Sequence, residues 1–423
     1  MSTLPSKSKG LPARRATGER VPAVRCKLCG GKTYAGLDLG AQPVGGLILT
    51  RADLRKPETF YPMQLFHCLD CGLTQLGYVV TPAVVSKSFP FVSGTTQTAT
   101  KHLQTIPEEL ARMGGLGPQS FAVDIGSNDG TLLKAYRPFG VRTLGVDPSA
   151  IPARIANEAG VMTLHAFFNE ETAKLVVLEQ GQGQADAISA AGVFAHIADL
   201  DSVMRGIQIL MKPTGIFVSE NQYWLDMVRT GHYDNIFHQH LRYFAIRPLA
   251  RLFARFNLEI FDVLRSEVHG GSFRVFACFA GAHPIHARVA QVMMEEEGAR
   301  LYDPITTTEW ALSIDARRRN LRERVWALAQ AGKKVIGIGA PAKASTVCNY
   351  CRLGPEVIDY ITEINPPRVG KFLPGVHIPI VDEEQMFSDP RPPDAAILFA
   401  WDHYEEAIPK LQKRGWKGEV ISP

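Results

Sequence analysis

One stretch of the chain, VDIGSNDGTLL at residues 123–133, constrains its fold more strongly than any other. An apolar run leads into a glycine turn and a helix start, and a second apolar run, LGVD, ends in Asp147. Glycines at positions 126 and 130 let a ligand approach the backbone closely, and the start of the helix presents free N–H groups to it. The stretch predicts a strand, turn, helix and strand of an α/β domain, built either for a nucleotide-like ligand or as an ordinary structural unit.

The charges around this turn favour one class of ligand. Asp147 comes 21 residues after Gly126, where an acid can accept hydrogen bonds from both ribose hydroxyls of a nucleoside. The turn lacks the G-x-G-x-x-G pattern of dinucleotide sites, and Asp129 would oppose a pyrophosphate. A nucleoside with a cationic or zwitterionic tail fits better, as in S-adenosyl-L-methionine. We expect the cofactor to contact Asp124, Gly126, Asn128 and Asp147, with Phe168 or Asn169 at the adenine edge.

Length and composition exclude several other classes of protein. A chain of 423 residues is too long for one typical domain, and it contains no apolar run of about eighteen residues that predicts a membrane span. The net charge of +4 is too small to indicate nucleic acid, and the basic excess is concentrated in residues 7–27. We expect a disordered tail over residues 1–21 without the apolar core of a secretory signal. The odd count of seven cysteines favours metal binding in a reducing cytoplasm over disulfides.

The order of patterns predicts three domains after the tail. Residues 22–85 are rich in glycine, cysteine and short β-like runs, which is typical of a small metal-binding domain. Residues 86–284 alternate strands with helices and end in two strands expected to form an antiparallel hairpin. Residues 285–423 begin with a charged helical stretch and continue as a second parallel α/β unit from Lys334. No repeat of solenoid period links the two α/β halves.

Two C-x-x-C pairs near the start of the chain predict a structural metal site. Each pair can place two thiolates on one ion, and two such knuckles make a closed tetrahedral Cys₄ zinc site without an open catalytic position. The 38 residues between the pairs exceed the spacing of a compact zinc ribbon, and four coincidentally spaced free thiols are the alternative. The expected zinc ligands are Cys26, Cys29, Cys68 and Cys71.

A second glycine turn and a third C-x-x-C pair lie in the C-terminal half. The sequence GIGAPA at residues 337–342 matches G-x-G-x-x-A after a strand, so it is compatible with NAD, with Glu363 at the ribose. Lys343 and Ser345 at the helix start indicate instead an anion site that would hold a phosphate. Cys348 and Cys351 fall inside the same expected helix, where packing is favoured over metal or redox use.

A cluster of histidines lies between the two α/β halves. His232, His238 and His240 fall within nine residues, beside aromatic side chains, and His196 follows an earlier strand. His238 and His240 would point the same way on a strand and would diverge on a helix. A His₂ metal site lacks a convincing third ligand, whereas an imidazole with a pKa near 6.5 is suited to proton abstraction at neutral pH. A general base is therefore the favoured interpretation over core or surface histidines.

The order and spacing of these blocks resemble the three-domain, zinc-containing sugar C-methyltransferases of deoxysugar and antibiotic biosynthesis, which methylate dTDP-4-keto sugars. The similarity covers nearly everything after about residue 22. It includes the knuckles, IGSNDGTLL, GVDPS, VFAHI, YDNIFHQHLRYF, GAPAKASTVCNY, GKFLPGVHIPI and PDAAILFAW. It implies an N-terminal zinc-binding domain, a class I Rossmann-like S-adenosylmethionine domain, and a C-terminal Rossmann-like domain that helps to hold a nucleotide-sugar.

The resemblance also implies a mechanism and its residues. A histidine removes the acidic proton beside the ketone, and the resulting enolate takes the methyl group from the sulfonium. The implied base falls on His240, and a second active-site histidine falls on His196, with His238 beside them. The expected substrate contacts are Glu220 and Asn221 in the acceptor pocket, Tyr243 at the oxygen of the enolate, and Lys343 and Ser345 at the diphosphate.

One departure from the family pattern bears on the substrate. Where the family usually has Tyr-His-Glu-His, this chain has Phe237, His238, Gln239 and His240. Phenylalanine cannot donate a hydrogen bond to an enolate, and glutamine cannot balance the charge of an imidazolium as glutamate would. Either His196 or Tyr243 supplies that contact, or the acceptor is a non-sugar enolisable metabolite. An NAD-dependent oxidoreductase and a nucleic-acid-binding protein are the remaining alternatives, although the latter lacks a sustained basic and aromatic stripe.

Overall fold

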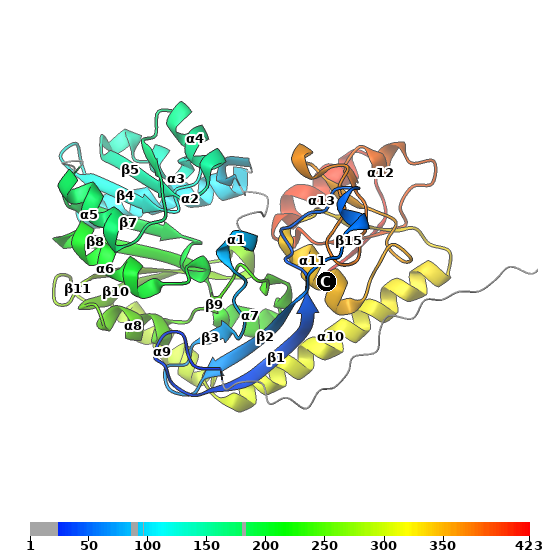
Figure 1. Ribbon diagram of the computed structural model, residues 1–423, viewed down its shortest axis with the longest axis horizontal. Helices are drawn as coiled ribbons and strands as arrows, with labels where there is room; N and C mark the ends of the chain where they lie inside the picture. Colours follow the sequence, from blue (N-terminus) through cyan, green and yellow to red (C-terminus); the bar gives the residue numbers. More distant parts are fainter. Residues whose placement is uncertain (1–23, 86–91, 96, 180–182) are drawn as a thin grey trace, which may run out of the picture.

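The computed structural model describes residues 24–85, 92–95, 97–179 and 183–423, so the tail expected over residues 1–21 lies outside it. Three sheets follow one another along the chain, and the long helix α10 (Pro304–Gln330) runs beneath β1 and β2 from one side of the molecule to the other (Figure 1). Across the described part of the chain, no helix is both long enough and apolar enough to span a bilayer.

The N-terminal sheet is antiparallel and has the order β1-β2-β3-β9. Its strands are β1 (Thr33–Gln42), β2 (Tyr61–Cys68), β3 (Thr74–Leu76) and β9 (Arg242–Tyr243), and α1 (Pro82–Val85) follows the first three in the chain. Along β1, Leu37 and Leu39 point into the core and their neighbours face outward, as the two-residue period of a half-buried strand requires. The fourth strand, β9, comes from the middle of the chain, directly after the histidine cluster.

The central sheet is a Rossmann-like α/β sheet with the order β10-β11-β8-β7-β4-β5-β6. Its parallel strands are β4 (Phe121–Ile125), β5 (Arg142–Asp147), β6 (Thr163–His165), β7 (Ala185–Ala191) and β8 (Met211–Gln222). All five residues of β4 are buried because helices cover both faces of the sheet. The expected antiparallel hairpin is present as β10 (Leu258–Ser266) and β11 (Ser272–Phe279). The fold class predicted for this part of the chain is confirmed.

The helices of the central unit precede or alternate with its strands along the chain. They are α2 (Gln97–Gly114), α3 (Thr131–Lys134), α4 (Ala150–Glu158), α5 (Glu170–Lys174), α6 (Leu200–Leu210), α7 (Trp224–Thr230) and α8 (Ile246–Ala254). In the sheet, β4 lies between β5 and β7, and the chain passes from β4 to β5 on one side before it returns to β7 on the other. The carboxyl ends of β4, β5 and β7 therefore meet at a switch in strand order, where sheets of this kind bind ligands.

The charged stretch after residue 285 forms α9 (Ala287–Gly298) and α10, as its periodicity predicts. Asp303 caps α10 by accepting a hydrogen bond from the backbone N–H of Ile305 at 2.8 Å, and Pro304 occupies the first helical position. The C-terminal unit is a second parallel sheet of order β14-β13-β12-β15-β16. Its elements are β12 (Val335–Ile338), α11 (Ala342–Cys351), β13 (Ile361–Glu363), β14 (Ile380–Asp382), α12 (Gln385–Ser388), β15 (Ala395–Leu398), α13 (Tyr404–Lys413) and β16 (Glu419–Ile421).

Candidate active site

The four cysteines predicted to bind zinc lie together. Their sulfur atoms are all within 4.8 Å of one another, with 3.5 Å between Cys26 and Cys71 and 3.5 Å between Cys29 and Cys68. A tetrahedral ion with Zn–S bonds of ~2.3 Å separates its sulfur ligands by roughly 3.8 Å, so this set fits a zinc ion. Backbone N–H groups also point at the thiols, as from Leu28 to the Cys26 sulfur at 3.4 Å. The long loop between the two pairs is used for β1 and β2, which explains why the spacing exceeds that of a compact ribbon.

The glycine turn after β4 is held open by backbone conformations that favour glycine. Gly126 has φ +73°, and a Cβ atom there would lie 2.5 Å from a methyl group of Val193. Asn128 takes a left-handed conformation with φ 53°, which asparagine tolerates better than most residues. A small cavity of about 20 Å³ lies against this turn, and it is lined by Ser93, Leu103, Asp124, Gly126, Ser127, Leu132 and Ala191.

Two buried acids flank this turn at the carboxyl ends of β4 and β5. Asp147 accepts hydrogen bonds from the backbone N–H groups of Asn128 at 2.9 Å and Ser149 at 2.7 Å. Asp124 accepts one from the Ser189 hydroxyl at 2.6 Å. Burial raises the pKa of Asp124 to about 7, and the nearby charge of Asp147 adds to this shift, while the Ser189 hydrogen bond opposes it. Both acids and the glycine turn therefore lie at the carboxyl edge of the central sheet, where the sequence predicts the cofactor.

Asp129, whose charge was expected to oppose a pyrophosphate, has internal hydrogen-bond partners. Its carboxylate accepts hydrogen bonds from the backbone N–H of Gly94 at 3.1 Å and from the Thr131 hydroxyl at 2.7 Å. The neighbouring Asn128 side chain accepts one from the backbone N–H of Ser93 at 3.0 Å. Residues 92–95 thus form a strap across the glycine turn, and these two polar side chains hold it there.

The two residues predicted at the adenine edge have structural contacts. Phe168 is buried and packs against α6, where a Cβ atom on Gly206 would come within 3.0 Å of its ring. Asn169 is the N-cap of α5, and its side chain accepts a hydrogen bond from the backbone N–H of Thr172 at 2.9 Å. Their contact with adenine stays a prediction. The preceding Phe167 is 66 % exposed and presents an open aromatic face at the same end of the sheet.

His196 and His240, 44 positions apart in the chain, form a contacting pair. Their ring centroids are 4.8 Å apart in an edge-to-face arrangement, and the ring of Phe237 lies 4.0 Å from that of His240. The Nδ1 atom of His240 lies 3.1 Å from the backbone carbonyl oxygen of Asn235. A carbonyl only accepts, so Nδ1 carries the proton and Nε2 carries the lone pair that a base requires.

Burial keeps both imidazoles neutral. It lowers the pKa of His240 well below its usual range, and the neighbouring His196 lowers it further, while the Asn235 carbonyl raises it in part. Burial also lowers the pKa of His196, which a backbone hydrogen bond with Gln239 partly offsets. Both imidazoles are therefore unprotonated at neutral pH, which leaves the Nε2 lone pair of His240 free, while burial weakens its basicity.

Two other candidates, His238 and Tyr243, lie near the His196–His240 pair in different positions. Residues 237–241 form a turn rather than a strand, so His238 and His240 diverge. The His238 ring lies beside the backbone of Pro43 and 5.9 Å from the ring of Tyr61, and its catalytic role stays a prediction. The Tyr243 ring lies next to that of His240, with the two ring centroids 6.3 Å apart.

Comparison with known proteins identifies the family. A C-methyltransferase NovU from Streptomyces niveus is 32% identical over 389 residues, which is 92% of this chain and 92% of the relative. Three family models match in order: a "putative zinc binding domain" at residues 26–85, a methyltransferase domain at 100–263, and a C-methyltransferase C-terminal domain at 267–423. The chain belongs to this family of C-methyltransferases. Its activity is S-adenosylmethionine-dependent C-methylation, and the family includes the metal site that the four cysteines form.

Solved structures overlap less of the chain. Geranyl diphosphate C-methyltransferase from Streptomyces coelicolor A3(2) is 16% identical with a TM-score of 0.31 and covers 44% of this chain and 87% of its own. The PH0226 protein from Pyrococcus horikoshii OT3 is 13% identical with a TM-score of 0.34 and covers 45% of this chain and 95% of its own.

The acceptor-pocket candidate Glu220 of the methyltransferase lies in a buried ion network. Its carboxylate contacts Nε2 of His102 at 2.6 Å and the guanidinium of Arg274 at 2.7 Å, and Arg274 also reaches Glu109 at 2.6 Å. Burial opposes ionisation, but His102 and Arg274 hold the pKa of Glu220 below its usual range. Asn221 donates a hydrogen bond to the Ser219 hydroxyl at 2.8 Å. The partners of Glu220 come from α2 and β11, which local sequence patterns do not bring together.

The diphosphate candidates have internal partners. The Lys343 ammonium lies 2.6 Å from the Asp402 carboxylate and 4.0 Å from the ring centre of Trp401. Ser345 is buried, and its hydroxyl donates to the Pro374 carbonyl at 3.4 Å. Asp402 already neutralises Lys343, so a diphosphate would compete with it, and both contacts stay predictions. Cys348 and Cys351 are buried in α11, as the packing interpretation expects.

The second glycine turn is also occupied by internal contacts. Glu363, the ribose acid that an NAD site would use, accepts hydrogen bonds from the backbone N–H groups of Ala340, Ile364 and Asn365 at 2.9–3.2 Å. Its other neighbour is Arg368, at 3.4 Å. Asp147 is held by backbone N–H groups in the same way, so these contacts do not decide against the oxidoreductase alternative; the family assignment does.

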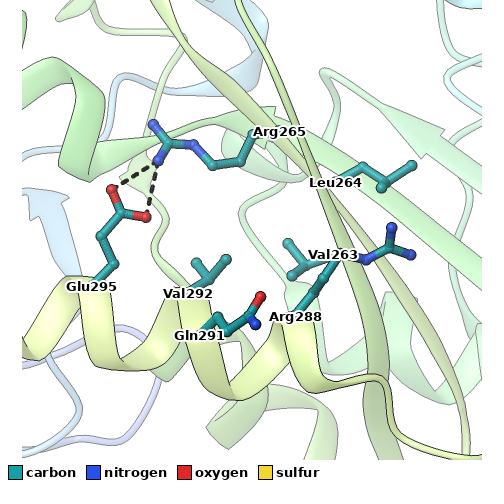
Figure 2. Close-up of a pocket in the computed structure, with 7 residues that line it drawn as sticks. All are labelled: Val263, Leu264, Arg265, Arg288, Gln291, Val292 and Glu295. Carbon is teal, nitrogen blue, oxygen red and sulfur yellow. Dashed lines mark hydrogen bonds and ion pairs between the residues drawn. The ribbon is translucent and has the colours of Figure 1, made fainter.

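The largest hollow of those described lies elsewhere on the methyltransferase. It has a volume of about 320 Å³ and lies between β10 and α9 (Figure 2). Figure 2 shows Arg265 paired with Glu295 at one end, where the atoms are 3.0 Å apart. Val263 and Val292 supply apolar lining. Its lining contains none of the glycine-turn or histidine-pair residues.

Proposed function

We propose that this C-methyltransferase acts on an enolisable carbon beside the ketone of a nucleotide-linked keto-deoxysugar, such as a dTDP-sugar, with His240 as the base. The observation that carries the proposal is the His196–His240 pair, with rings 4.8 Å apart and Nδ1 of His240 anchored on the Asn235 carbonyl. The sugar substrate is supported by the similarity of the sequence blocks described above, and a small-molecule acceptor agrees with the family.

In this mechanism His240 removes the proton beside the ketone. A ketone makes the hydrogen on the neighbouring carbon acidic, and the lone pair on Nε2 of His240 accepts it. When bound, S-adenosylmethionine supplies a methyl group on a positively charged sulfur atom. The electron pair released by the broken C–H bond then forms the new bond to the methyl carbon, while the pair of the broken sulfur–methyl bond would remain on sulfur and leave an uncharged thioether. His240 leaves the step as an imidazolium. Burial of the pair keeps water away from this charge.

Tyr243 is our candidate for stabilising the enolate oxygen. Burial raises the pKa of its phenol well above the usual range, so the hydroxyl keeps its proton and can donate it in a hydrogen bond. Within the described residues this hydroxyl makes no well-formed hydrogen bond, although the Phe237 backbone lies beside it. His196 is the second donor that faces His240. Together, Tyr243 and His196 would supply the hydrogen bond that the tyrosine of the family pattern donates and Phe237 cannot.

The remaining site residues follow from the same placement. Asp147 would hold the ribose, and Asp124, Gly126 and Asn128 would surround the methionine part, with Phe168 or Asn169 toward the adenine. The acceptor would meet Glu220 and Asn221, and its diphosphate would meet Lys343 and Ser345. His238 is the third histidine candidate. Zinc would be structural, because all four of its positions are filled by cysteine. The proposed domains are residues 22–85, 86–284 and 285–423.

His240→Ala tests the base directly. We expect turnover to fall by roughly 10²- to 10⁴-fold, because a positioned general base contributes about that factor. The affinity for S-adenosylhomocysteine, measured by titration calorimetry, is expected to stay within about twofold. His283→Ala is the matched comparison, since its ring stacks on Phe261 outside the site and turnover should largely persist. Full turnover in His240→Ala would remove it as the base.

A non-sugar enolisable metabolite is the second candidate acceptor. Phe237 and Gln239 favour it, because they remove a hydroxyl and a carboxylate that the family pattern places beside the base. The two acceptors are separated by comparing methyl transfer to a dTDP-4-keto-6-deoxysugar with transfer to β-keto acids. Transfer only to the latter would assign the non-sugar class.

A further inference from the structure

We infer that Trp401 and Asp234 are positioning residues for His240, so that the C-terminal unit orients the base of the central unit. This inference rests on the proposed role of His240. It starts from the Asn235 carbonyl, which fixes the imidazole through its contact with Nδ1. That carbonyl belongs to a 3₁₀ turn, Tyr233–Asn235, whose three residues are buried. Whatever holds this turn also sets the direction of Nε2.

The C-terminal unit holds the turn through three side chains. The indole N–H of Trp401 donates to the Asp234 carboxylate at 2.5 Å, and the Thr346 hydroxyl donates to the Ile236 carbonyl at 2.9 Å. The Tyr233 hydroxyl lies 3.4 Å from the Cys351 sulfur. Thr346 and Cys351 both belong to α11, so one rigid helix contacts both ends of the turn.

Trp401 is itself fixed by its neighbours. The His232 ring stacks on it with centroids 4.0 Å apart and planes 23° apart. The Lys343 ammonium lies 4.0 Å from the ring centre and is anchored by Asp402 at 2.6 Å. Asp402 also lies 3.2 Å from Nδ1 of His269, and the backbone carbonyl of His269 accepts a hydrogen bond from the Asn235 side chain at 3.3 Å.

These contacts leave little freedom to the loop that carries the base. Asp234 is 3 % exposed, so removing its indole donor leaves a buried carboxylate without that partner. The turn would then shift or loosen, and the Asn235 carbonyl would move with it. A displacement of about 1 Å at a reacting group can lower turnover by ~10²-fold. The geometry thus gives Lys343 a function in holding Trp401.

The test compares Trp401→Phe with Trp416→Phe in the full-length, zinc-loaded protein. Each variant removes one indole N–H donor from the same unit, but Trp416 donates to the Pro393 carbonyl at 3.2 Å, away from the histidine loop. Thr346→Val removes the second contact to the turn. Histidine ¹⁵N spectra report the tautomer of His240, whose signal is assigned by its absence in His240→Gln. Turnover of a dTDP-4-keto-6-deoxysugar and the affinity for S-adenosylhomocysteine are measured in parallel.

We expect Trp401→Phe and Thr346→Val to convert the single tautomer of His240 into a mixture. Turnover should fall by about tenfold or more, with cofactor affinity within about twofold and Trp416→Phe unchanged in both respects. A single tautomer retained in Trp401→Phe, or an altered tautomer with unchanged turnover, would overturn the inference. If the wild-type protein does not methylate the sugar, the proposed acceptor fails, and the tautomer measurement alone decides the positioning role.

Discussion

At the scale of single residues, the site contains a carboxyl group whose pKa its surroundings raise to about 7. Asp124 is buried near the end of β4, and the Asp147 charge is nearby. The Ser189 hydroxyl at 2.6 Å provides one hydrogen bond. A protonated Asp124 would reduce the negative charge beside the zwitterionic part of the cofactor, so Asp147 alone would carry the charge that faces the ribose.

Asp124→Asn should remove a pH dependence of stability. Burial raises the folded-state pKa to about 7, whereas an unfolded aspartate has a pKa near ~3.9, so the unfolded chain releases its proton first as pH rises. The wild-type protein should lose stability relative to the variant between about pH 4 and pH 7, by up to roughly 4 kcal/mol, and the difference should level off above this range. Urea denaturation of both proteins across this range measures it. A constant difference would contradict the raised pKa.

At the scale of elements, the strap of residues 92–95 shapes the cofactor edge. A Cβ atom on Gly94 would lie 2.6 Å from the Asp129 carboxylate and 3.0 Å from the Thr131 hydroxyl. Gly94→Ala should therefore push the strap from the turn and remove the Ser93 partner of Asn128. We expect affinity for S-adenosylhomocysteine to weaken by about tenfold, the factor that ~1.4 kcal/mol produces. Gly117→Ala is the control, because open space surrounds that glycine. Tighter binding in Gly94→Ala would mean that the strap obstructs the site.

Some features of the site could be predicted from the sequence and others could not. The positions of the glycine turn, of Asp147 and of the four cysteines were predictable because they depend on spacing within one local unit or on a metal-ligand pattern, whereas the cofactor contacts of Asp147 and of the turn stay predictions. The relative directions of His238 and His240 were left open between a strand and a helix, and the chain forms a turn there instead. The internal partners of Lys343 and Glu220 were not predictable, since Asp402 and Arg274 reach them from other elements. No local pattern reveals such tertiary partners.

At the scale of the whole molecule, the histidine loop is held from both sides. The C-terminal unit contacts the turn before His240, as described above. After His240, the chain continues into β9, where Tyr243 pairs with Thr74 of β3 in the N-terminal sheet. Strand β3 begins three residues after the zinc ligand Cys71, and the backbone N–H of Cys68 donates to the Leu73 carbonyl at 2.9 Å. The metal knuckles therefore connect to the base through two short strands.

Removing zinc should consequently impair turnover more than cofactor binding. The loss of one ligand frees the knuckles, and with them β3 and β9, because a structural metal site contributes folding free energy to the segment that it closes. The glycine turn lies in the separate central sheet, so affinity for S-adenosylhomocysteine should remain within about threefold while turnover falls by roughly tenfold or more. We would measure both in Cys29→Ser and in chelator-treated protein, with bound zinc determined by elemental analysis. Cys278→Ser, a buried cysteine of β11 outside the knuckles, is the control for loss of a thiol. If Cys29→Ser loses its zinc but keeps full turnover, the N-terminal sheet does not hold the base.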